Sequence, residues 1–156
     1  MSFEIKNCRF GRGLFATRNI KNGELILTFT GSLISQEEVD KKVDEEEANP
    51  LQIEDEFYID LEEPGILVNH SCNPNVGIQN DTKLVAIRDI KAGEEIMYDY
   101  STTVDGGWTM PCKCGEKNCR KKVKDFLMLP KKIQKQYLEQ KIVQKYIQKN
   151  ISKPSR

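Results

Sequence analysis

Three cysteines within a stretch of eight residues place the strongest constraint on how this chain can fold. They lie in Cys112-Lys113-Cys114-Gly115-Glu116-Lys117-Asn118-Cys119, which has the spacing C-x-C-x4-C and a glycine that permits a tight turn. Three thiolates this close together suit one tetrahedral zinc ion, and a structural zinc site takes four ligands. The fourth ligand must come from elsewhere in the chain, and the candidates are Cys8, Cys72 and the only histidine, His70. The sequence therefore predicts one zinc ion that ties this segment to another part of the fold.

The alternative is that these three cysteines are unrelated thiols in an apolar core. The segment is too polar for a core position, because it also contains Lys113, Glu116, Lys117 and Asn118, so we favour zinc.

The N-terminus lacks the basic and then apolar pattern of a secretory signal, and no apolar run approaches the roughly 20 residues that span a bilayer. Five cysteines in such a chain fit metal binding better than disulfides. We therefore expect an intracellular protein, cytoplasmic or nuclear, with no membrane partner.

Charge is distributed unevenly along a chain whose formal net charge is zero. Residues 1–119 carry 12 Lys and Arg against 22 Asp and Glu, whereas residues 120–156 carry 12 against 2. An acidic body of this kind attracts a lysine-rich partner and speeds its encounter. A run of charge can equally be a solvated surface. The sequence leaves these two interpretations open.

Residues that favour strands dominate the first hundred positions, and helical spacing appears near the end of the chain. Short runs of β-branched and aromatic residues lie between turn residues at 25–30, 57–61, 84–87 and 95–98. The charged stretch from Ser35 to Asn49 is typical of a short exposed helix. After Pro130, a favoured first-turn residue, apolar side chains recur at helical spacing as far as Ile147. We therefore expect a mainly β domain with some α-structure, including a C-terminal amphipathic helix packed against the β-body.

The most specific stretch of the chain is Asn69-His70-Ser71-Cys72-Asn73-Pro74-Asn75. It resembles the N-H-S-C-x-P-N signature of SET-domain lysine methyltransferases. Three other segments resemble motifs of that family in the family's order: Gly11-Arg12-Gly13 its G-x-G motif, Phe29-Thr30-Gly31 its Y-x-G motif, and residues 94–100 its E-(L/I)-x-(F/Y)-D-Y motif. The cysteine segment, followed by Arg120, resembles the post-SET zinc segment. Together these similarities cover residues 9–120.

The resemblance implies a SET fold of several small curved sheets, in which the N-H-S-C segment and the final tyrosine segment thread past each other like a pseudoknot. It also implies that Cys72 is the fourth zinc ligand, beside Cys112, Cys114 and Cys119. On this basis we expect a monomer with three parts: a SET domain over residues 1–108, a post-SET zinc segment over 109–122, and a C-terminal helix with a basic tail over 123–156.

The same resemblance implies S-adenosylmethionine as the cofactor. The segment Gly11-Arg12-Gly13 is expected to meet the amino-acid end of the cofactor, because glycines let backbone come close; the alternative for glycines alone is an ordinary turn. The backbone around Asn69 and His70 is expected to meet the adenine, with no catalytic role for His70. Tyr100 matches the near-invariant tyrosine of the family, so it is expected to border the cofactor and aim its hydroxyl at the reacting centre.

The implied reaction moves a methyl group from sulfur to the neutral amine of a lysine in a basic, lysine-rich protein, such as a histone or a DNA-packaging protein. Free lysine has a pKa of about 10.4, so it must lose a proton before its lone pair can attack. A narrow aromatic channel and a nearby sulfonium charge both favour the neutral amine. Tyr98 is assigned to catalysis with Tyr100, and Tyr58 is a further candidate for the channel wall, although an aromatic residue in a strand can equally be core.

Two positions bear on how many methyl groups are added. Tyr98 stands where the family has Phe or Tyr, and tyrosine there goes with stopping at one or two methyls. Phe29 replaces the usual tyrosine of the Y-x-G motif and removes a hydroxyl that often touches the substrate amine. The resemblance therefore predicts mono- or dimethylation, with Phe29 acting in the opposite sense.

Two other functions fit parts of the sequence. A catalytically inactive SET-like module would bind a basic peptide through the acidic body, but it would not need Gly13, Asn69, His70 and Tyr100 together. A zinc-bearing nucleic-acid binder would use the basic tail, but the zero net charge and the acidic body disfavour it. We therefore expect no direct binding of nucleic acid. Neither alternative needs S-adenosylmethionine, so binding of that cofactor separates both from the enzyme.

Overall fold

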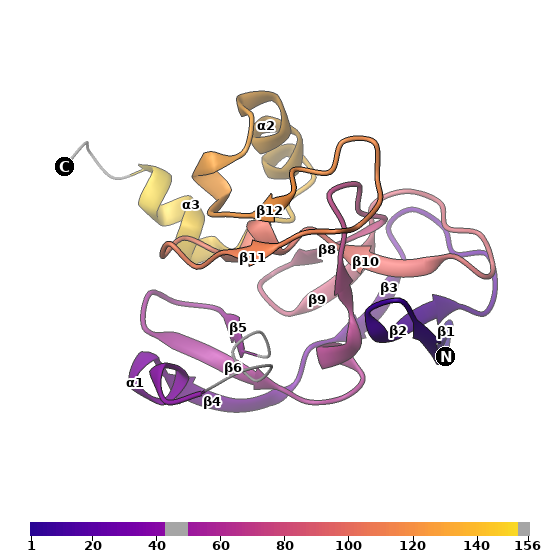
Figure 1. Cartoon of the computed structure of the whole chain (residues 1–156), viewed down its shortest axis with the longest axis horizontal. Coiled ribbons are helices and arrows are strands. Elements are labelled where there is room, and N and C mark those ends of the chain that lie inside the picture. The colour runs from indigo at the N-terminus through magenta and orange to yellow at the C-terminus, as the bar shows by residue number, and fades with distance from the viewer. Residues whose placement is uncertain (43–49, 153–156) are drawn as a thin grey trace.

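The computed structural model describes residues 1–42 and 50–152. Most of the elements are short strands, and the two longest α-helices close the chain (Figure 1). In chain order the elements are β1 (Phe3–Cys8), β2 (Gly11–Ala16), β3 (Leu25–Thr28), β4 (Gly31–Ser35), α1 (Gln36–Asp40), β5 (Pro50–Gln52), β6 (Phe57–Leu61), the 3-10 helix η2 (Gly65–Leu67), β7 (Asn69–His70), β8 (Val76–Gln79), β9 (Lys83–Ala86), β10 (Glu95–Tyr98), η3 (Tyr100–Thr103), β11 (Met110–Pro111), β12 (Lys122–Val123), η4 (Phe126–Met128), α2 (Lys131–Glu139) and α3 (Lys145–Ser152).

Within residues 1–42 and 50–152 the strands form four small sheets, with the orders β1-β2-β10-β7, β3-β9-β8, β4-β6-β5 and β11-β12. In Figure 1 helix α2 lies above β11 and β12, helix α3 (yellow) lies to their left, and the β4-β6-β5 sheet (purple to magenta) lies below them. The prediction of a mainly β fold built from several small sheets is confirmed.

The strand boundaries follow the sequence closely, with one break that has a steric cause. β6 and β10 have the predicted bounds, but the run at 25–30 ends at Thr28 and β4 starts at Gly31. Gly31 has a φ of 153°, and a Cβ at this position would collide with the backbone carbonyl of Asp60 on the neighbouring strand. The glycine therefore lets the chain approach β6 closely enough to pair with it.

The charged stretch after Ser35 begins with the predicted exposed helix. The Ser35 side chain caps α1 by accepting a hydrogen bond from the Glu38 backbone N–H at 3.3 Å. No residue of α1 is buried, as expected for a charged segment. Residues 43–49 of the predicted helix lie outside the described residues.

The predicted helical region after Pro130 is confirmed, and it consists of two helices rather than one. Lys141 lies between α2 and α3 with a φ of 62°, a left-handed conformation that interrupts a right-handed helix. The residues that follow it, Ile142, Val143 and Gln144, are buried. Side chains of α2 and α3 pack with η4 into one core cluster, in which Phe126 and Ile147 are fully buried.

The two most specific motifs of the chain meet in one strand pair. β7 pairs in parallel with β10, which places Asn69 opposite Met97 and His70 opposite Tyr98. Beyond the pair, the Ser71 backbone N–H donates to the Tyr98 carbonyl at 3.0 Å. The fold therefore brings the N-H-S-C segment and the tyrosine segment side by side, although they lie about 30 positions apart in the chain.

Candidate active site and metal centre

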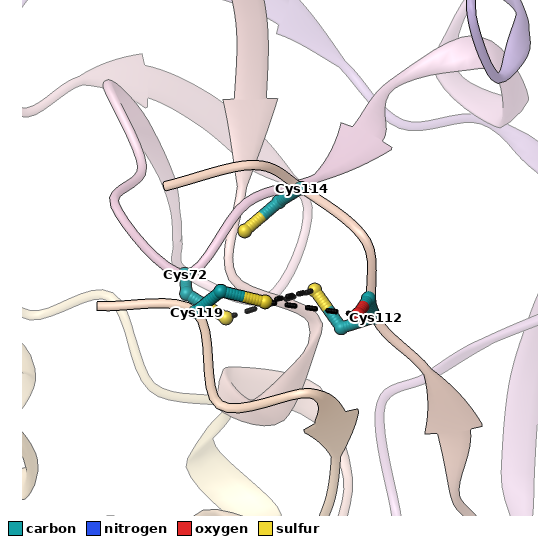
Figure 2. Close-up of side chains that lie close together, drawn as sticks. All are labelled: Cys72, Cys112, Cys114 and Cys119. Atoms are coloured by element: carbon teal, nitrogen blue, oxygen red, sulfur yellow. Dashed lines mark hydrogen bonds between the residues drawn. The ribbon is translucent and has the colours of Figure 1, made fainter. Parts of the chain in front are cut away.

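Four cysteine sulfurs lie close enough together to hold one zinc ion. The Sγ atoms of Cys72, Cys112, Cys114 and Cys119 all lie within 4.8 Å of one another, and Figure 2 shows them pointing towards a common centre. The distances from Cys112 Sγ to Cys72 Sγ and to Cys119 Sγ are both 3.7 Å. A tetrahedral zinc with Zn–S bonds of about 2.3 Å would separate its sulfurs by about 3.8 Å. The donor set and its spacing therefore fit zinc.

Of the three sequence candidates for the fourth ligand, Cys72 is the one that joins the cluster. Cys8 instead lies near the β1–β2 turn, where its Sγ is 3.5 Å from the Asn69 side-chain nitrogen. His70 lies beside the cluster, with Nε2 at 3.4 Å from Cys72 Sγ. Among the described residues, no other group of histidine, cysteine or acidic side chains has metal-binding proximity.

The surroundings of the thiols differ, and their pKa values differ with them. Burial raises the pKa of Cys112 to about 11, and burial also raises the pKa of Cys72. The Lys121 backbone N–H, 3.4 Å from Cys119 Sγ, lowers the pKa of Cys119 to about 7. Zinc binds thiolates, so filling the cluster must displace protons from Cys72 and Cys112.

In the described part of the chain, two cavities share Tyr100 in their lining, and one of them borders the cysteine cluster. The first, which we call the glycine-turn cavity, has a volume of about 710 Å³ and lies between the β1–β2 turn, the segment before and within β7, and the cysteine segment. Its lining includes Phe10, Gly11, Arg12, Leu67, Asn69, His70, Tyr100, Met110, Cys112 and Cys114.

The second, the tyrosine cavity, has a volume of about 530 Å³. It lies between α1, the β5–β6 hairpin and the segment that follows β10. Three carboxylates and one lysine contribute to its lining, and that lysine, Lys42, pairs with Asp60 at 3.3 Å. The cavity is therefore acidic on balance. Its lining includes Asp40, Gln52, Asp55, Tyr58, Tyr98, Tyr100, Thr103, Asp105 and Trp108.

Tyr100 lines both cavities, whereas Tyr98 lines only the tyrosine cavity. The Tyr100 hydroxyl donates a hydrogen bond to the Val68 carbonyl at 2.7 Å. Burial raises the pKa of Tyr100, and the Glu95 carboxylate raises it further. Burial likewise raises the pKa of Tyr98. Both side chains are therefore neutral phenols at pH 7, able to donate a hydrogen bond but unsuited to act as a base.

His70 is held as a neutral ring. Burial lowers its pKa to about 4. The Tyr100 backbone N–H donates to His70 Nδ1 at 3.0 Å. A backbone N–H can only donate, so Nδ1 is the acceptor and the proton of the neutral ring lies on Nε2, which faces Cys72 Sγ. His70 thus orients Tyr100 and borders the cysteine cluster.

The residues predicted to meet the cofactor surround the glycine-turn cavity, with one exception. Gly11, with a φ of 98°, lines it together with Arg12, whose guanidinium pairs with Glu63. Gly13 lies behind the lining instead. A Cβ there would collide with the Glu95 carboxylate and lie 3.0 Å from the Asn69 side-chain nitrogen. The absence of a side chain at Gly13 therefore allows the Asn69–Glu95 hydrogen bond of 2.9 Å to form.

Of the two remaining aromatic candidates, Tyr58 lies in the wall of a cavity and Phe29 lies in the core. Tyr58 lines the tyrosine cavity and donates its hydroxyl to Gln36 Oε1 at 2.6 Å. Phe29 is buried, and its ring lies edge-on to that of Tyr98 with 6.1 Å between the ring centroids. It is not among the residues that line the tyrosine cavity in the described part of the chain. Phe29 therefore supports Tyr98 from behind.

Sequence reasoning missed one polar cluster next to the site. The Asp99 carboxylate is fully buried and accepts hydrogen bonds from Arg120 and from the hydroxyl of Tyr137. Two of the three residues of this cluster lie in segments that the sequence marks as functional: Asp99 belongs to the tyrosine motif, and Arg120 follows the last cysteine of the zinc segment. Tyr137 looked like one of several core residues of an amphipathic helix, and nothing in the sequence marked its hydroxyl.

No helix in the described ranges, 1–42 and 50–152, is long and apolar enough to cross a membrane.

Known proteins with similar sequences carry the same domain that the motifs of this chain resemble. A family model described as "SET domain" matches residues 11–101. The "Variant-silencing SET domain-containing protein" of Plasmodium falciparum is 34% identical over 137 residues, which cover 74% of this chain and 5% of that protein.

Two further relatives are named as methyltransferases. The "Histone-lysine N-methyltransferase, H3 lysine-36 specific" of Candida albicans is 33% identical over 127 residues, covering 71% of this chain and 15% of that protein. The human "Histone-lysine N-methyltransferase 2B" is 33% identical over 127 residues, covering 71% of this chain and 5% of that protein. The chain thus corresponds to a small part of the length of these relatives.

A solved structure shares the fold. The "crystal structure of KRYPTONITE in complex with mCHG DNA and SAH" superposes with a TM-score of 0.62 at 23% identity, covering 78% of this chain and 28% of that chain. The family match spans more than half of the residues and includes the glycine turn, the N-H-S-C segment and Tyr100. On these grounds the chain belongs to the SET-domain family.

Proposed function

We propose that this chain transfers a methyl group from S-adenosylmethionine to the side-chain amine of a lysine in a basic protein. The observation that carries the proposal is the position of Tyr100, which lines both cavities. A group-transfer enzyme needs its two reactants to meet at one point from separate sites. The names of the relatives, several of which are histone-lysine methyltransferases, support the same reaction class.

The glycine-turn cavity is the proposed cofactor site. When bound, S-adenosylmethionine supplies an electrophilic methyl group on a sulfonium. The cavity volume of about 710 Å³ lies within the usual range for small-molecule sites, about 300–1,000 Å³. We assign Gly11, Arg12, Asn69, His70 and Tyr100 to cofactor binding from the lining, and Gly13 as the residue that lets Asn69 take its place.

The tyrosine cavity is the proposed lysine site. Its carboxylates Asp40, Asp55 and Asp105 attract a cationic protein segment. Deeper in the cavity, the phenols of Tyr98 and Tyr100 line the wall, with their ring centroids 4.8 Å apart. An aromatic wall disfavours the ammonium form and so favours the neutral amine that attacks the methyl group. We assign Tyr100 and Tyr98 to catalysis: Tyr100 orients the reacting groups, and Tyr98 limits the space for a methylated amine.

The role proposed for zinc is structural. Cys112 and Cys114 line the glycine-turn cavity, and Cys72 follows directly after the N-H-S residues. Bound to these three cysteines and to Cys119, a zinc ion would fix the cysteine segment as one wall of the cofactor site. No step of the transfer needs the metal.

An inactive module that binds a basic peptide remains the alternative, and cofactor binding separates the two. We expect calorimetric titration to give one S-adenosylmethionine site per chain, and labelled cofactor to transfer its methyl to a histone or another lysine-rich protein. Asn69→Ala should weaken cofactor binding. Asn73→Ala, in the same motif but exposed and outside both linings, is the matched control. Failure of the wild type to bind the cofactor would contradict the proposal.

A further inference from the structure

We propose that Arg120 and Tyr137 are positioning residues for Tyr100 and act through the Asp99 carboxylate. Both lie outside residues 11–101, the part of the chain that matches the SET domain. The inference rests on the proposed function, because it assigns Tyr100 to the reacting centre. It gives the cysteine segment and α2 an indirect part in that centre, because each holds the Asp99 carboxylate next to Tyr100.

Asp99 is a buried charge that must be paired. Its side chain has no exposed surface, and an unpaired carboxylate in such a place is strongly unfavourable. Within the turn itself it accepts only the Ser101 backbone N–H, at 3.0 Å. The remaining partners come from other parts of the chain, so the position of this carboxylate depends on them.

Arg120 brings the first partner from the cysteine segment. Its Nη2 lies 2.8 Å from each Asp99 carboxylate oxygen, and its side chain is only 17% exposed. Arg120 follows Cys119 directly, and its backbone N–H points at Cys72 Sγ from 3.4 Å. The ion pair therefore forms only when the cysteine segment is folded against Cys72.

Tyr137 brings the second partner from α2. Its hydroxyl donates to Asp99 Oδ2 at 2.9 Å, and the side chain is buried. Burial and the neighbouring Asp99 carboxylate raise the pKa of Tyr137, so the phenol keeps its proton and remains a donor. The hydroxyl therefore ties the helix to the carboxylate without adding charge.

The carboxylate sits one residue before Tyr100, in a turn fixed at several points. Tyr100 N–H is bonded to His70 Nδ1 at 3.0 Å, and Thr102 N–H is bonded to the Asp99 carbonyl at 3.1 Å. A displacement of the Asp99 side chain therefore moves the backbone that carries Tyr100. Misplacing a reacting group by about 1 Å can slow catalysis by about a hundredfold.

The test compares two variants of one helix. Tyr137→Phe removes the hydroxyl that reaches Asp99. The control, Gln134→Met, removes a buried amide of α2 that donates instead to the carbonyls of Leu127 and Leu129. Both should lower the melting temperature. We expect Tyr137→Phe to lower kcat about tenfold with the KM values for peptide and cofactor nearly unchanged, and Gln134→Met to leave kcat within about twofold of wild type.

Two further measurements complete the test. Arg120→Lys keeps a cation for Asp99 and should retain more activity than Arg120→Met at equal zinc content. The nitrogen NMR signals of the only histidine ring, His70, should shift in Tyr137→Phe and stay in place in Gln134→Met, because His70 Nδ1 accepts from Tyr100.

The proposal is overturned if Tyr137→Phe keeps the wild-type kcat and His70 signals, or if both α2 variants lose kcat in parallel with their melting temperature. A wild type that transfers no methyl would contradict the proposed function instead. In that case the His70 signals alone decide whether Tyr137 positions the turn.

Discussion

Tyr98 and Tyr100 lie side by side with their ring centroids 4.8 Å apart and their planes at 43°, yet they face different spaces. Tyr100 borders both cavities, whereas Tyr98 borders only the acidic one. Although the two tyrosines are only two residues apart, the difference in the cavities that they line suits them to different tasks. Under the proposed function, methyl donor and acceptor meet at Tyr100, and a methylated amine needs room beside Tyr98.

The first prediction concerns the number of methyl groups. Tyr98 lines the cavity proposed as the lysine site, where its hydroxyl would take up space that a methylated amine needs. The wild type should therefore stop at one or two methyls, and Tyr98→Phe should add at least one more. Tyr58→Phe is the matched control, because the Tyr58 hydroxyl is held by Gln36 and its loss should leave the number unchanged. Mass spectrometry of one peptide substrate decides. Abundant trimethyl-lysine from the wild type would show that Tyr98 sets no such limit.

The second prediction concerns zinc. Purified protein should contain one zinc per chain, and Cys72→Ser should lose it, because the hydroxyl of serine is a poor replacement for a thiolate ligand. Cys8→Ser should keep the metal, since Cys8 lies apart from the cluster. Elemental analysis of the three proteins provides the measurement. Unchanged zinc in Cys72→Ser, or loss of zinc in Cys8→Ser, would contradict the assigned ligand set.

The third prediction concerns acid. Burial lowers the His70 pKa from 6.5 to about 4. The unfolded chain therefore binds a proton that the folded chain excludes, and stability falls as the pH drops through the window from about 6.5 to about 4. Between pH 7.5 and 5.5 the wild type should lose about 1 kcal/mol more unfolding free energy than His70→Asn, whose amide oxygen can still accept from Tyr100 but does not titrate.

Two measurements check the behaviour of His70. Urea unfolding of both proteins at the two pH values gives the difference in free energy. NMR of the only histidine ring gives its titration midpoint directly. Equal acid sensitivity of the two proteins, or a midpoint near 6.5, would show that His70 is not held neutral by burial.

Much of this site could be predicted from local sequence. The cysteine spacing limits the fourth zinc ligand to three candidates. Short runs of β-branched and aromatic residues between turn residues predict the strands, whereas their arrangement in several small sheets was expected from the resemblance to the SET family. The motifs also contain four residues that line the glycine-turn cavity, namely Gly11, Asn69, His70 and Tyr100. Pairing of β7 with β10 brings the motifs of Asn69 and Tyr100 side by side. The division at residues 108 and 122 remains a prediction.

Other features depend on contacts between distant segments. The sequence shows an apolar stripe at Tyr137, but not that its hydroxyl reaches Asp99, 38 positions away. Phe29 sits behind Tyr98, which strand alternation alone does not show. The break at Lys141 was missed because the apolar spacing continues through it, and a lysine gives no turn signal of its own.

The central claim is that methyl transfer takes place where Tyr100 joins the two cavities, and Tyr100→Phe tests it most directly. Loss of the hydroxyl bond to the Val68 carbonyl should cost about 1 kcal/mol of stability, so the fold should survive. A preorganised hydrogen bond at a reacting centre contributes about a hundredfold or more to the rate. Transfer of labelled methyl to a lysine peptide, measured with cofactor affinity in the same samples, should fall by at least that factor in Tyr100→Phe while the cofactor still binds. Near-normal transfer in the variant would contradict the account.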